Sequence, residues 1–447
     1  MPFDSASPRH TPMPHQETGA TFLAMRGFAM LCDEPGLGKT LQSILACDYA
    51  GARKVLVVCP AVVRRMWEDE FLVNQQIDRL VRACEGNPKD APGDGVTIVS
   101  HAAFADEAAV ATLRQGAPYD VIILDESHQI RQMDAARCRN LLAPGGAWTW
   151  AKHFWCLTGT PIVNSAADVW PLFYGPLQDP LSWWDFGVRY AEVMKQDAYG
   201  GIRPIGLQRQ DELAKYLRPH MLRRTLESVG ILLPPLTVEQ RAVEVPPAVL
   251  TRIMSDLDNW TQERLDLALE EKDELHDSAL ARVRKALGLA KAEAVARYVH
   301  DMLLAREGPV VVFFQHTAVR EELFNMLSRQ CGWKVSWIDG KVTLPQLKAA
   351  KEWFQAGRLD VVLVQTDAGG VGISLTRSNR VVIGELPWTA VALWQGVKRC
   401  HRIGTTRPVL AEVMRARGCW LDEALAGTIS KKDLAAHKLL SLLETNQ

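Results

Sequence analysis

The stretch LCDEPGLGKT, from Leu31 to Thr40, decides how the rest of this sequence is interpreted. It departs by one residue from the phosphate-binding pattern G-x-x-x-x-G-K-[ST]. Gly38, Lys39 and Thr40 match that pattern, whereas Asp33 stands where its first glycine belongs. The stretch is therefore either a loop that holds the phosphates of a nucleotide or a glycine-rich turn that caps a helix.

The segments on both sides of the loop favour the nucleotide site. The apolar run GFAMLCDE precedes it, and KTLQSILACDYA behind it has apolar residues at helical spacing. A loop between a strand and the N-terminus of a helix presents backbone N–H groups to phosphates. In such a loop Lys39 would contact the β- and γ-phosphates, and Thr40 would bind Mg²⁺.

A pair of acidic residues strengthens this prediction. In VIILDESH, Asp125 and Glu126 directly follow an apolar run, where the end of a buried strand meets the site. Asp125 would hold Mg²⁺ through water, and Glu126 would polarise the attacking water. An isolated Asp-Glu pair at the end of a strand would simply face solvent. Behind a phosphate-binding loop in an α/β region, the pair instead predicts hydrolysis.

Composition restricts the class of protein. The chain has 447 residues, 47% of them hydrophobic and 23% charged, which indicates two or three globular domains. No apolar run approaches the ~20 residues that span a bilayer, and the N-terminal residues lack the apolar core of a secretory signal. We therefore expect a cytoplasmic protein, associated with the nucleoid if it is bacterial or from a phage. Nine cysteines without a C-x-x-C pair argue against a zinc site or a disulfide framework.

Two regions of the chain share one sequence pattern, in which short β-branched runs alternate with stretches of helical periodicity. Such runs predict buried parallel strands joined by helical crossovers, and hence an α/β fold with two parallel-sheet lobes. The runs span 54–60, 96–100, 120–126 and 154–160 in the first region, and 309–314, 334–339, 360–366 and 380–385 in the second.

The proline-punctuated stretch LLPPLTVEQRAVEVPPAV separates the two regions and places a boundary near Leu232. We expect a first, ATP-binding lobe over residues 1–231, with a helical insertion at about 171–224. Trp183 and Trp184 fall in this insertion, and such an aromatic pair usually belongs to a core. The second lobe would span 232–447, with a helical insertion at about 250–304 and C-terminal helices at about 419–443.

The motifs DEPGLGKT, DESH and LTGTP (157–161), in this order, resemble those of the superfamily-two helicases. They look specifically like the Swi/Snf-type DNA translocases, whose usual loop reads D-E-M-G-L-G-K-T, so that Asp33 is the form this family uses. GLAKAEAVARYV and the short length resemble the annealing-helicase (HARP-like) branch. The resemblance runs from Pro14 to about Leu443. It implies two RecA-like lobes, an ATP hydrolase that uses ATP and Mg²⁺, and double-stranded or forked DNA as the partner of a monomer.

The resemblance also implies roles for particular residues. ATP would be bound by Gln16, which would read the adenine, and by the loop residues Asp33, Glu34, Pro35, Gly36, Leu37, Gly38, Lys39 and Thr40. DNA would be contacted by Pro60, Arg64, Ser100, His101, Thr366, Gly369, Gly370 and Trp388, although Trp388 could equally be a core residue. Hydrolysis would be coupled to movement through Thr158, Gly159 and Thr160.

The stretch QGVKRCHR places Gln395, Arg399 and Arg402 at i, i+4 and i+7, on one face of a predicted helix. Two arginines on one face can form a solvated stripe. Here they follow a glycine-rich turn in the lobe opposite the nucleotide loop. An arginine brought across a cleft stabilises charge on the γ-phosphoryl group only when the lobes close. We therefore predict catalytic roles for Arg399 and Arg402, and a contact in the cleft for Gln395.

The sequence departs from the family pattern at several positions, namely Asp367, Lys348, Arg131-Gln132 and Thr405. None of these changes removes a hydrolytic group, but each could alter DNA affinity or coupling. Three functions therefore remain open: a duplex translocase, a nucleotide-gated DNA-binding scaffold, and a strand-separating DNA or RNA helicase. Retention of Lys39, Glu126 and Arg402 favours an enzyme over a scaffold.

Overall fold

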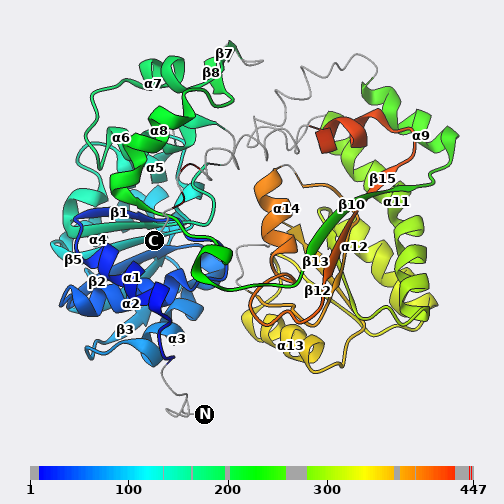
Figure 1. Ribbon diagram of the computed structural model, residues 1–447, viewed down its shortest axis with the longest axis horizontal. Coiled ribbons are helices and arrows are strands. Elements are labelled where there is room, and N and C mark those ends of the chain that lie inside the picture. Colours follow the sequence, from blue (N-terminus) through cyan, green and yellow to red (C-terminus); the bar gives the residue numbers. More distant parts are fainter. Residues whose placement is uncertain are drawn as a thin grey trace. The chain divides into compact units, whose positions relative to one another are not determined.

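Two separate parallel sheets organise the chain (Figure 1). The computed structural model describes residues 10–133, 135–162, 165–196, 202–257, 279–366, 373–387, 389–427, 442 and 444. The chain divides into two compact units, of which the first contains residues 1–231 and 435–447 and the second residues 232–434. Among the described residues no helix has the length and apolar character needed to cross a bilayer.

The sheet of the first unit has seven strands in the order β3-β4-β2-β5-β6-β1-β9, and every pairing is parallel. Each strand predicted in the first region is present, and so is the strand before the loop. The strands are β1 (Phe28–Leu31), β2 (Lys54–Cys59), β3 (Val81–Ala83), β4 (Gly95–Ser100), β5 (Tyr119–Asp125), β6 (Ala151–Leu157) and β9 (Met221–Leu222).

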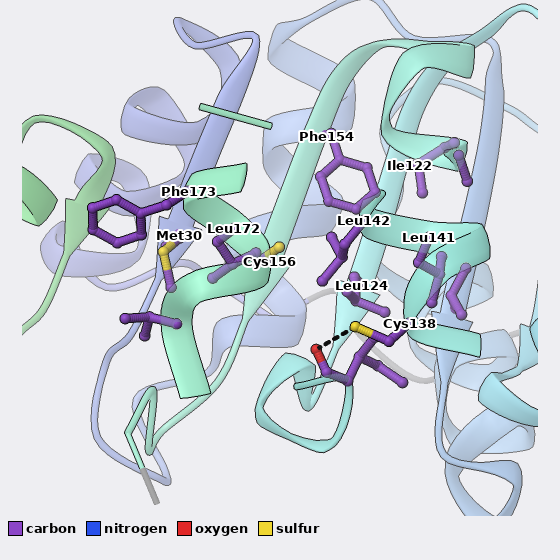
Figure 2. Close-up of a cluster of buried hydrophobic side chains, with 14 of the residues drawn as sticks. Met30, Ile122, Leu124, Cys138, Leu141, Leu142, Phe154, Cys156, Leu172 and Phe173 are labelled. Carbon is purple, nitrogen blue, oxygen red and sulfur yellow. Dashed lines mark hydrogen bonds between the residues drawn. The ribbon is translucent and has the colours of Figure 1, made fainter. Parts of the chain in front are cut away.

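Helices cover both faces of this sheet, which explains why its strands are apolar without alternation. Ile122 and Leu124 of β5 face one cluster, shown in Figure 2, whereas Val121 and Ile123 face the opposite one. The cluster of Figure 2 packs against α4 (Glu107–Gln115), α5 (Ala136–Leu142) and α6 (Trp170–Tyr174), and the opposite cluster against α1 (Pro14–Ala24), α2 (Lys39–Tyr49) and α3 (Arg64–Asn74).

The insertion expected to be helical at about 171–224 contains strands as well as helices, so that part of the prediction is wrong. Between α7 (Trp183–Tyr190) and α8 (Gln210–Leu217) lies an antiparallel hairpin of β7 (Val193–Gln196) and β8 (Ile202–Ile205). A helix is disfavoured there because Pro204 lacks an N–H and Gly206 adopts a φ of 75°. The two tryptophans have different environments, since Trp183 packs against the core and Trp184 is 47% exposed.

The second unit has six parallel strands in the order β10-β15-β14-β11-β13-β12. Every strand predicted in the second region is present, whereas β10 and β15 were not predicted. The strands are β10 (Leu236–Val243), β11 (Val310–Phe314), β12 (Val335–Ile338), β13 (Val361–Gln365), β14 (Arg380–Ile383) and β15 (Val409–Ala416). The helices include α9 (Pro247–Met254), α11 (Ala279–Leu304), α12 (Thr317–Phe324), α13 (Leu344–Gln355) and α14 (Ala390–Val397).

The described parts of the two segments predicted to be helical in the second lobe are helical. The insertion expected at about 250–304 includes α9 and α11, and residues 420–427 begin the expected C-terminal helices. Leu442, near the end of the chain, groups with the first unit. The guanidinium group of Arg218 donates two hydrogen bonds, of 2.6 and 3.1 Å, to the carbonyl of Leu442.

A buried ion pair fastens the long helix α11 to the end of the second sheet. Nζ of Lys291 lies 3.0 Å from Oδ2 of Asp422 and also donates to the carbonyl of Met414 at 3.0 Å. The side chains of Lys291 and Asp422 are only 2% and 3% exposed. Oδ2 of Asp422 accepts a further hydrogen bond from the N–H of Ala416, at 2.8 Å. The pair therefore connects α11, β15 and the segment that follows it.

We predict that Asp422→Ala lowers the free energy of unfolding by ~3–5 kcal/mol, because it leaves the ammonium group of Lys291 buried without its partner. The double change Lys291→Met, Asp422→Ala should cost less than the single one, since no charge is then stranded. Urea denaturation followed by circular dichroism measures both effects.

A pair on the same helix serves as control. Arg297 and Glu293 form an ion pair with side chains 71% and 69% exposed, so Glu293→Ala should cost less than ~1 kcal/mol. If Asp422→Ala and Glu293→Ala lowered the free energy of unfolding equally, burial of the Lys291 pair would not increase its contribution to stability.

Candidate active site

The loop between β1 and α2 has the geometry of a phosphate-binding loop. Gly36 and Gly38 adopt φ angles of 102° and 74°, in the left-handed region that favours glycine. A Cβ atom at Gly38 would lie 2.4 Å from Nε2 of Gln16, so a larger residue would be strained there. The first N–H groups of α2 receive no side-chain cap. An uncapped helix N-terminus next to a glycine loop is suited to bind an anion.

The side chain of Lys39 lies between the loop and the turn that follows β6. Nζ of Lys39 donates to the carbonyls of Asp33, at 2.7 Å, and of Glu34, at 3.4 Å. The same Nζ would be 3.6 Å from a Cβ placed on Gly159, in the turn that follows β6. Thr40 is the second residue of α2 and is half-buried. Lys39 therefore lies between the loop and the LTGTP turn, as a phosphate-binding lysine would.

Asp33, which stands in the place of the first glycine, has a structural role. Its carboxylate is fully buried and accepts hydrogen bonds from the backbone N–H, Nε and Nη2 of Arg224, at 3.1, 3.1 and 2.6 Å. Nε2 of Gln42 donates to the same carboxylate at 3.0 Å. Arg224 also donates to Oε1 of Gln42 at 2.8 Å and to the carbonyl of His15 at 2.5 Å. Asp33 therefore supports the loop from inside the fold. Its carboxylate is hydrogen-bonded within the protein and does not face the phosphate site.

The segment around Arg224 runs along the loop through backbone contacts. The N–H of Cys32 donates to the carbonyl of Leu222 at 2.7 Å, and the N–H of Glu34 to the carbonyl of Arg224 at 3.0 Å. The carboxylate of Glu34 accepts the N–H of Leu226 at 2.9 Å. This carboxylate too is thus engaged within the protein.

Arg223 connects the loop to the turn after β6. Its Nη1 donates to the carbonyl of Cys32 at 2.9 Å and to that of Gly159 at 3.4 Å. In the same turn, the N–H of Thr158 donates to the carbonyl of Leu31 at 3.1 Å, and the N–H of Thr160 to Oγ1 of Thr158 at 3.0 Å. The turn and the loop are therefore held together.

The carboxylate of Asp125, at the end of β5, is held from two sides. Oδ1 accepts the N–H of Glu126 and Oδ2 accepts the indole N–H of Trp67, both at 2.9 Å. The carbonyl of Asp125 lies 2.8 Å from Nε2 of His101. Burial, followed by the charge of Glu126, raises the pKa of Asp125 to about 6, despite the hydrogen bonds that the carboxylate accepts. A cation at this carboxylate would relieve that cost.

Glu126 is kept ionised by its neighbours. Its Oε2 lies 3.2 Å from Nδ1 of His128, which in turn lies 3.0 Å from Oγ1 of Thr158. Burial acts to raise the pKa of Glu126, but the hydrogen bond and charge of His128, together with Lys39, outweigh it and lower the pKa. Glu126 adopts a φ of 47°, an uncommon angle for a residue other than glycine. An ionised carboxylate in this place has the chemistry of a general base.

These groups fit a nucleotide with Mg²⁺. Asp125 and the hydroxyl of Thr40 are oxygen ligands of the kind that Mg²⁺ prefers, while Lys39 and the uncapped end of α2 suit phosphates. Oγ1 of Thr160 is buried and has no hydrogen-bond partner within the described residues. A buried polar atom without a partner is uncommon and marks a place where a ligand would complete the site. Among the same residues there is no cluster of three or more His, Cys, Asp or Glu side chains able to hold a metal alone.

The residues predicted to contact DNA in the first unit divide into two groups. Pro60 directly follows β2 and is buried, whereas Arg64 begins α3 and is half-buried. Nε of Arg64 donates to the carbonyl of Ala61 at 3.1 Å and its Nη1 to that of Cys84. Ser100 and His101 are only 7% and 5% exposed. Burial lowers the pKa of His101 to about 4, so its imidazole is neutral and supports Asp125 from within. Of these four residues, only Arg64 has a side chain that is partly exposed.

The predicted single helical face of Gln395, Arg399 and Arg402 is wrong, because α14 ends at Val397. Beyond it the chain turns, and the carbonyl of Arg399 accepts the N–H of Leu375 at 2.9 Å. The carbonyl of Cys400 accepts the hydroxyl of Thr405 at 2.6 Å. These donors take carbonyls that a further helical turn would need, and they stop the helix.

The predicted residues of the second unit nevertheless have distinct surroundings. Gln395 is half-buried on α14, and Arg399 is 6% exposed. Arg402 is also half-buried, forms no ion pair among the described residues, and has its pKa lowered by burial. Thr366 is buried and donates to the carbonyl of Phe314 at 3.2 Å. Gly369, Gly370 and Trp388 lie outside the described residues.

Sequence reasoning missed several side chains that hold the site. Sequence reasoning assigned no role to Arg223 and Arg224, which directly follow β9. His128 lies within the DESH motif, and its spacing from Glu126 could have suggested a partner. Trp67 sits within a helical apolar pattern and gave no sign of its polar contact.

The family comparisons match both units. The SNF2-related domain model matches residues 15–249, and the helicase conserved C-terminal domain model matches residues 290–404. A Sulfolobus solfataricus SWI2/SNF2 ATPase core in complex with dsDNA aligns over 98% of this chain and 96% of its own, with 19% identity and a TM-score of 0.43.

Curated relatives align over most of this chain. The DNA annealing helicase and endonuclease ZRANB3 of Mus musculus is 26% identical over 443 residues, covering 94% of this chain and 40% of the relative. The SWI/SNF-related matrix-associated actin-dependent regulator of chromatin subfamily A-like protein 1 of Xenopus tropicalis is 27% identical over 425 residues, covering 91% of this chain and 42% of the relative. The chain thus spans about two fifths of the length of these relatives. Because the SNF2-related domain model covers more than half of the sequence, the chain belongs to the SNF2-related family of helicase-like ATPases.

Proposed function

We propose that this chain is an ATP-dependent translocase of double-stranded DNA, which couples hydrolysis to closure of its two units and to movement along the duplex. One observation carries the proposal. Lys39, the carboxylates of Asp125 and Glu126, and the turn at Thr158 gather at one edge of the first sheet, through the contacts described above. A DNA-binding scaffold would not need a base that its neighbours keep ionised.

In the proposed reaction, Lys39 and the N-terminus of α2 bind the β- and γ-phosphates, and Asp125 and Thr40 hold Mg²⁺. The metal ion supplies positive charge that offsets the charge of the phosphates. The carboxamide of Gln16 is fixed at the loop, since its Nε2 donates to the carbonyl of Leu37 at 3.4 Å and its Oε1 accepts the N–H of Met13 at 3.0 Å. That position suits recognition of the adenine next to the phosphates.

Glu126 acts as the general base. It accepts the proton of the water that attacks the γ-phosphorus, while the bond to the bridging oxygen of ADP breaks and phosphate leaves. Nδ1 of His128 lies between the carboxylate of Glu126, at 3.2 Å, and Oγ1 of Thr158, at 3.0 Å, in the turn proposed to couple hydrolysis to movement. Gly159 and Thr160 complete this turn.

The second unit contributes the arginines. A partly desolvated guanidinium without an ion pair among the described residues, as in Arg402, is suited to meet charge that develops on a phosphoryl group. We assign this role to Arg402, with Arg399 as its neighbour and Gln395 as a contact in the closed cleft. The DNA backbone would be bound by Pro60 and Arg64 in the first unit. In the second unit it would be bound around Thr366, Gly369, Gly370 and Trp388.

The names of the relatives suggest which change in DNA structure translocation would produce. One of them carries the name annealing helicase, and rewinding of separated strands requires translocation on a duplex toward a junction. We extend this activity to the present chain, which would drive re-pairing of a bubble or regression of a fork. We further propose that the protein acts as a monomer in the cytoplasm, associated with the nucleoid if it is bacterial or from a phage.

We predict that Lys39→Ala abolishes ATP binding and hydrolysis, because it removes the cation that contacts the phosphates. Glu126→Gln should retain ATP binding but lower turnover by about 10²–10⁴-fold, since an amide cannot accept the proton. Binding of a fluorescent ATP analogue and release of phosphate measure the two properties separately. Glu107→Gln, at an exposed position on α4, is the matched control. Near-normal hydrolysis by Glu126→Gln would refute its role as the base.

We predict that Arg402→Ala lowers the turnover number by about 10³-fold or more, the usual worth of an arginine that stabilises the transferred phosphoryl group. Nucleotide affinity should change little, because the phosphate-binding groups of the first unit are intact. Arg407→Ala, at an exposed arginine of the same unit, is the control. Equal losses in affinity and turnover would instead assign Arg402 to support of the fold.

We predict that duplex DNA stimulates the ATPase strongly and that stimulation decreases as salt is added. Contacts to phosphates release counterions, which makes binding steeply salt-dependent. The protein should displace the third strand of a triplex and should fail to separate a blunt duplex. ATP-dependent separation of a blunt duplex without triplex displacement would favour a strand-separating helicase. Activity that is equally high without DNA would favour a nucleotide-gated scaffold.

A further inference from the structure

We propose that Trp67 is a positioning residue for the metal–nucleotide site, where its indole N–H fixes the orientation of the Asp125 carboxylate. The inference rests on the proposed function, because it takes Asp125 to be the carboxylate that holds Mg²⁺.

The contact is specific and buried. Nε1 of Trp67 lies 2.9 Å from Oδ2 of Asp125. Trp67 is 0% exposed, and its ring packs on that of Phe71, with ring centroids 6.0 Å apart, in the core that α1, α2 and α3 form against the sheet. A ring enclosed in a close-packed interior does not turn freely, so the direction of its N–H is fixed.

The two donors on Asp125 have different origins. Oδ1 accepts the N–H of Glu126, which belongs to the same turn as Asp125 and moves with it. Oδ2 accepts the indole of Trp67, 58 residues earlier in the chain and on another element. Within the part of the chain that the structure describes, the indole is therefore the one group outside this turn that donates to the carboxylate. Side chains that hold a metal ligand from behind in this way commonly set the affinity of the metal.

The helix that carries Trp67 also carries a residue proposed to contact DNA. Trp67 lies on the first turn of α3, the helix that begins at Arg64, a residue proposed to contact DNA. His101, which directly follows β4, lies with its Nε2 2.8 Å from the carbonyl of the same Asp125. β4 pairs with β2, the strand that precedes α3. Two segments that follow adjacent strands thus converge on one carboxylate. A shift of α3 would move the donor of Asp125 with it.

The test compares two tryptophans of the same core. Trp155, like Trp67, is 0% exposed and belongs to the same buried cluster, but its Nε1 donates to the carbonyl of Arg26 at 3.3 Å. Trp67→Phe and Trp155→Phe therefore remove the same ring N–H from equivalent packing, and only the first change involves Asp125. The readout is binding of a fluorescent ATP analogue to the full chain as Mg²⁺ is titrated, with EDTA as the metal-free condition.

We expect Trp67→Phe to raise the Mg²⁺ concentration for half-maximal nucleotide binding by about tenfold or more, the usual effect of losing a side chain that supports a metal ligand. Affinity in EDTA should equal that of the parent protein. Trp155→Phe should leave both values unchanged, although both variants lose thermal stability to a similar degree.

A double-mutant cycle provides the second measurement. In the Asp125→Asn background, Trp67→Phe should produce no further change in Mg²⁺ dependence, because the partner carboxylate is already absent. An identical Mg²⁺ dependence for Trp67→Phe and Trp155→Phe, or full additivity in the cycle, would overturn the proposal. A parent protein that binds the analogue equally well with Mg²⁺ and with EDTA would instead contradict the metal step of the proposed function, and the two failures are therefore distinguishable.

Discussion

The carboxylate of Asp33 is fully buried, and the first unit is arranged so that this charge is paired. An ionised group inside a protein costs several kcal/mol unless a counter-charge and hydrogen bonds surround it. Arg224, 191 residues later, supplies the counter-charge and three of the donors. Gln42 and the carbonyl of His15 complete the network. Consequently α1, the phosphate-binding loop, α2 and the segment after α8 form one connected structure, and Asp33 replaces a glycine at no loss to the loop.

This network also determines where the chain leaves the first unit. The segment from Leu222 to Leu226 is hydrogen-bonded along the loop at Cys32 and Glu34, and the boundary of the second unit follows at Leu232. Arg223 connects the same segment to Gly159, in the turn after β6. A change in the loop therefore acts directly on the start of the connection to the second unit. In the proposed translocase, this segment would transmit a change at the phosphates toward the second unit.

The predictable parts of the fold are those with one strong local signal. Every apolar run predicted to be a strand is a parallel strand, because strands covered on both faces have no polar alternation. β10 escaped prediction since most of its residues are exposed, and β9 since it has only two residues. The spacing of Gln395 and Arg399 satisfied a helix, but the hydroxyl of Thr405, from beyond the segment, helps end it. The pairing of Asp33 with Arg224 could not be predicted, because nothing local distinguishes a buried arginine from an exposed one.

The acidic pair shows how neighbouring residues acquire different chemistry from their surroundings. Asp125 and Glu126 are adjacent carboxylates, yet burial and the neighbouring charge raise the pKa of the first to about 6, whereas His128 and Lys39 overcome burial and lower the pKa of the second. Asp125 is therefore the carboxylate that gains most from a bound cation, and Glu126 is the one that stays ionised without it. Two carboxylates whose environments separate their pKa values can serve as ligand and base side by side. In the proposed reaction, the surroundings of the two carboxylates rather than their residue type would assign each its role, and the contacts of His128 and Trp67 are part of those surroundings.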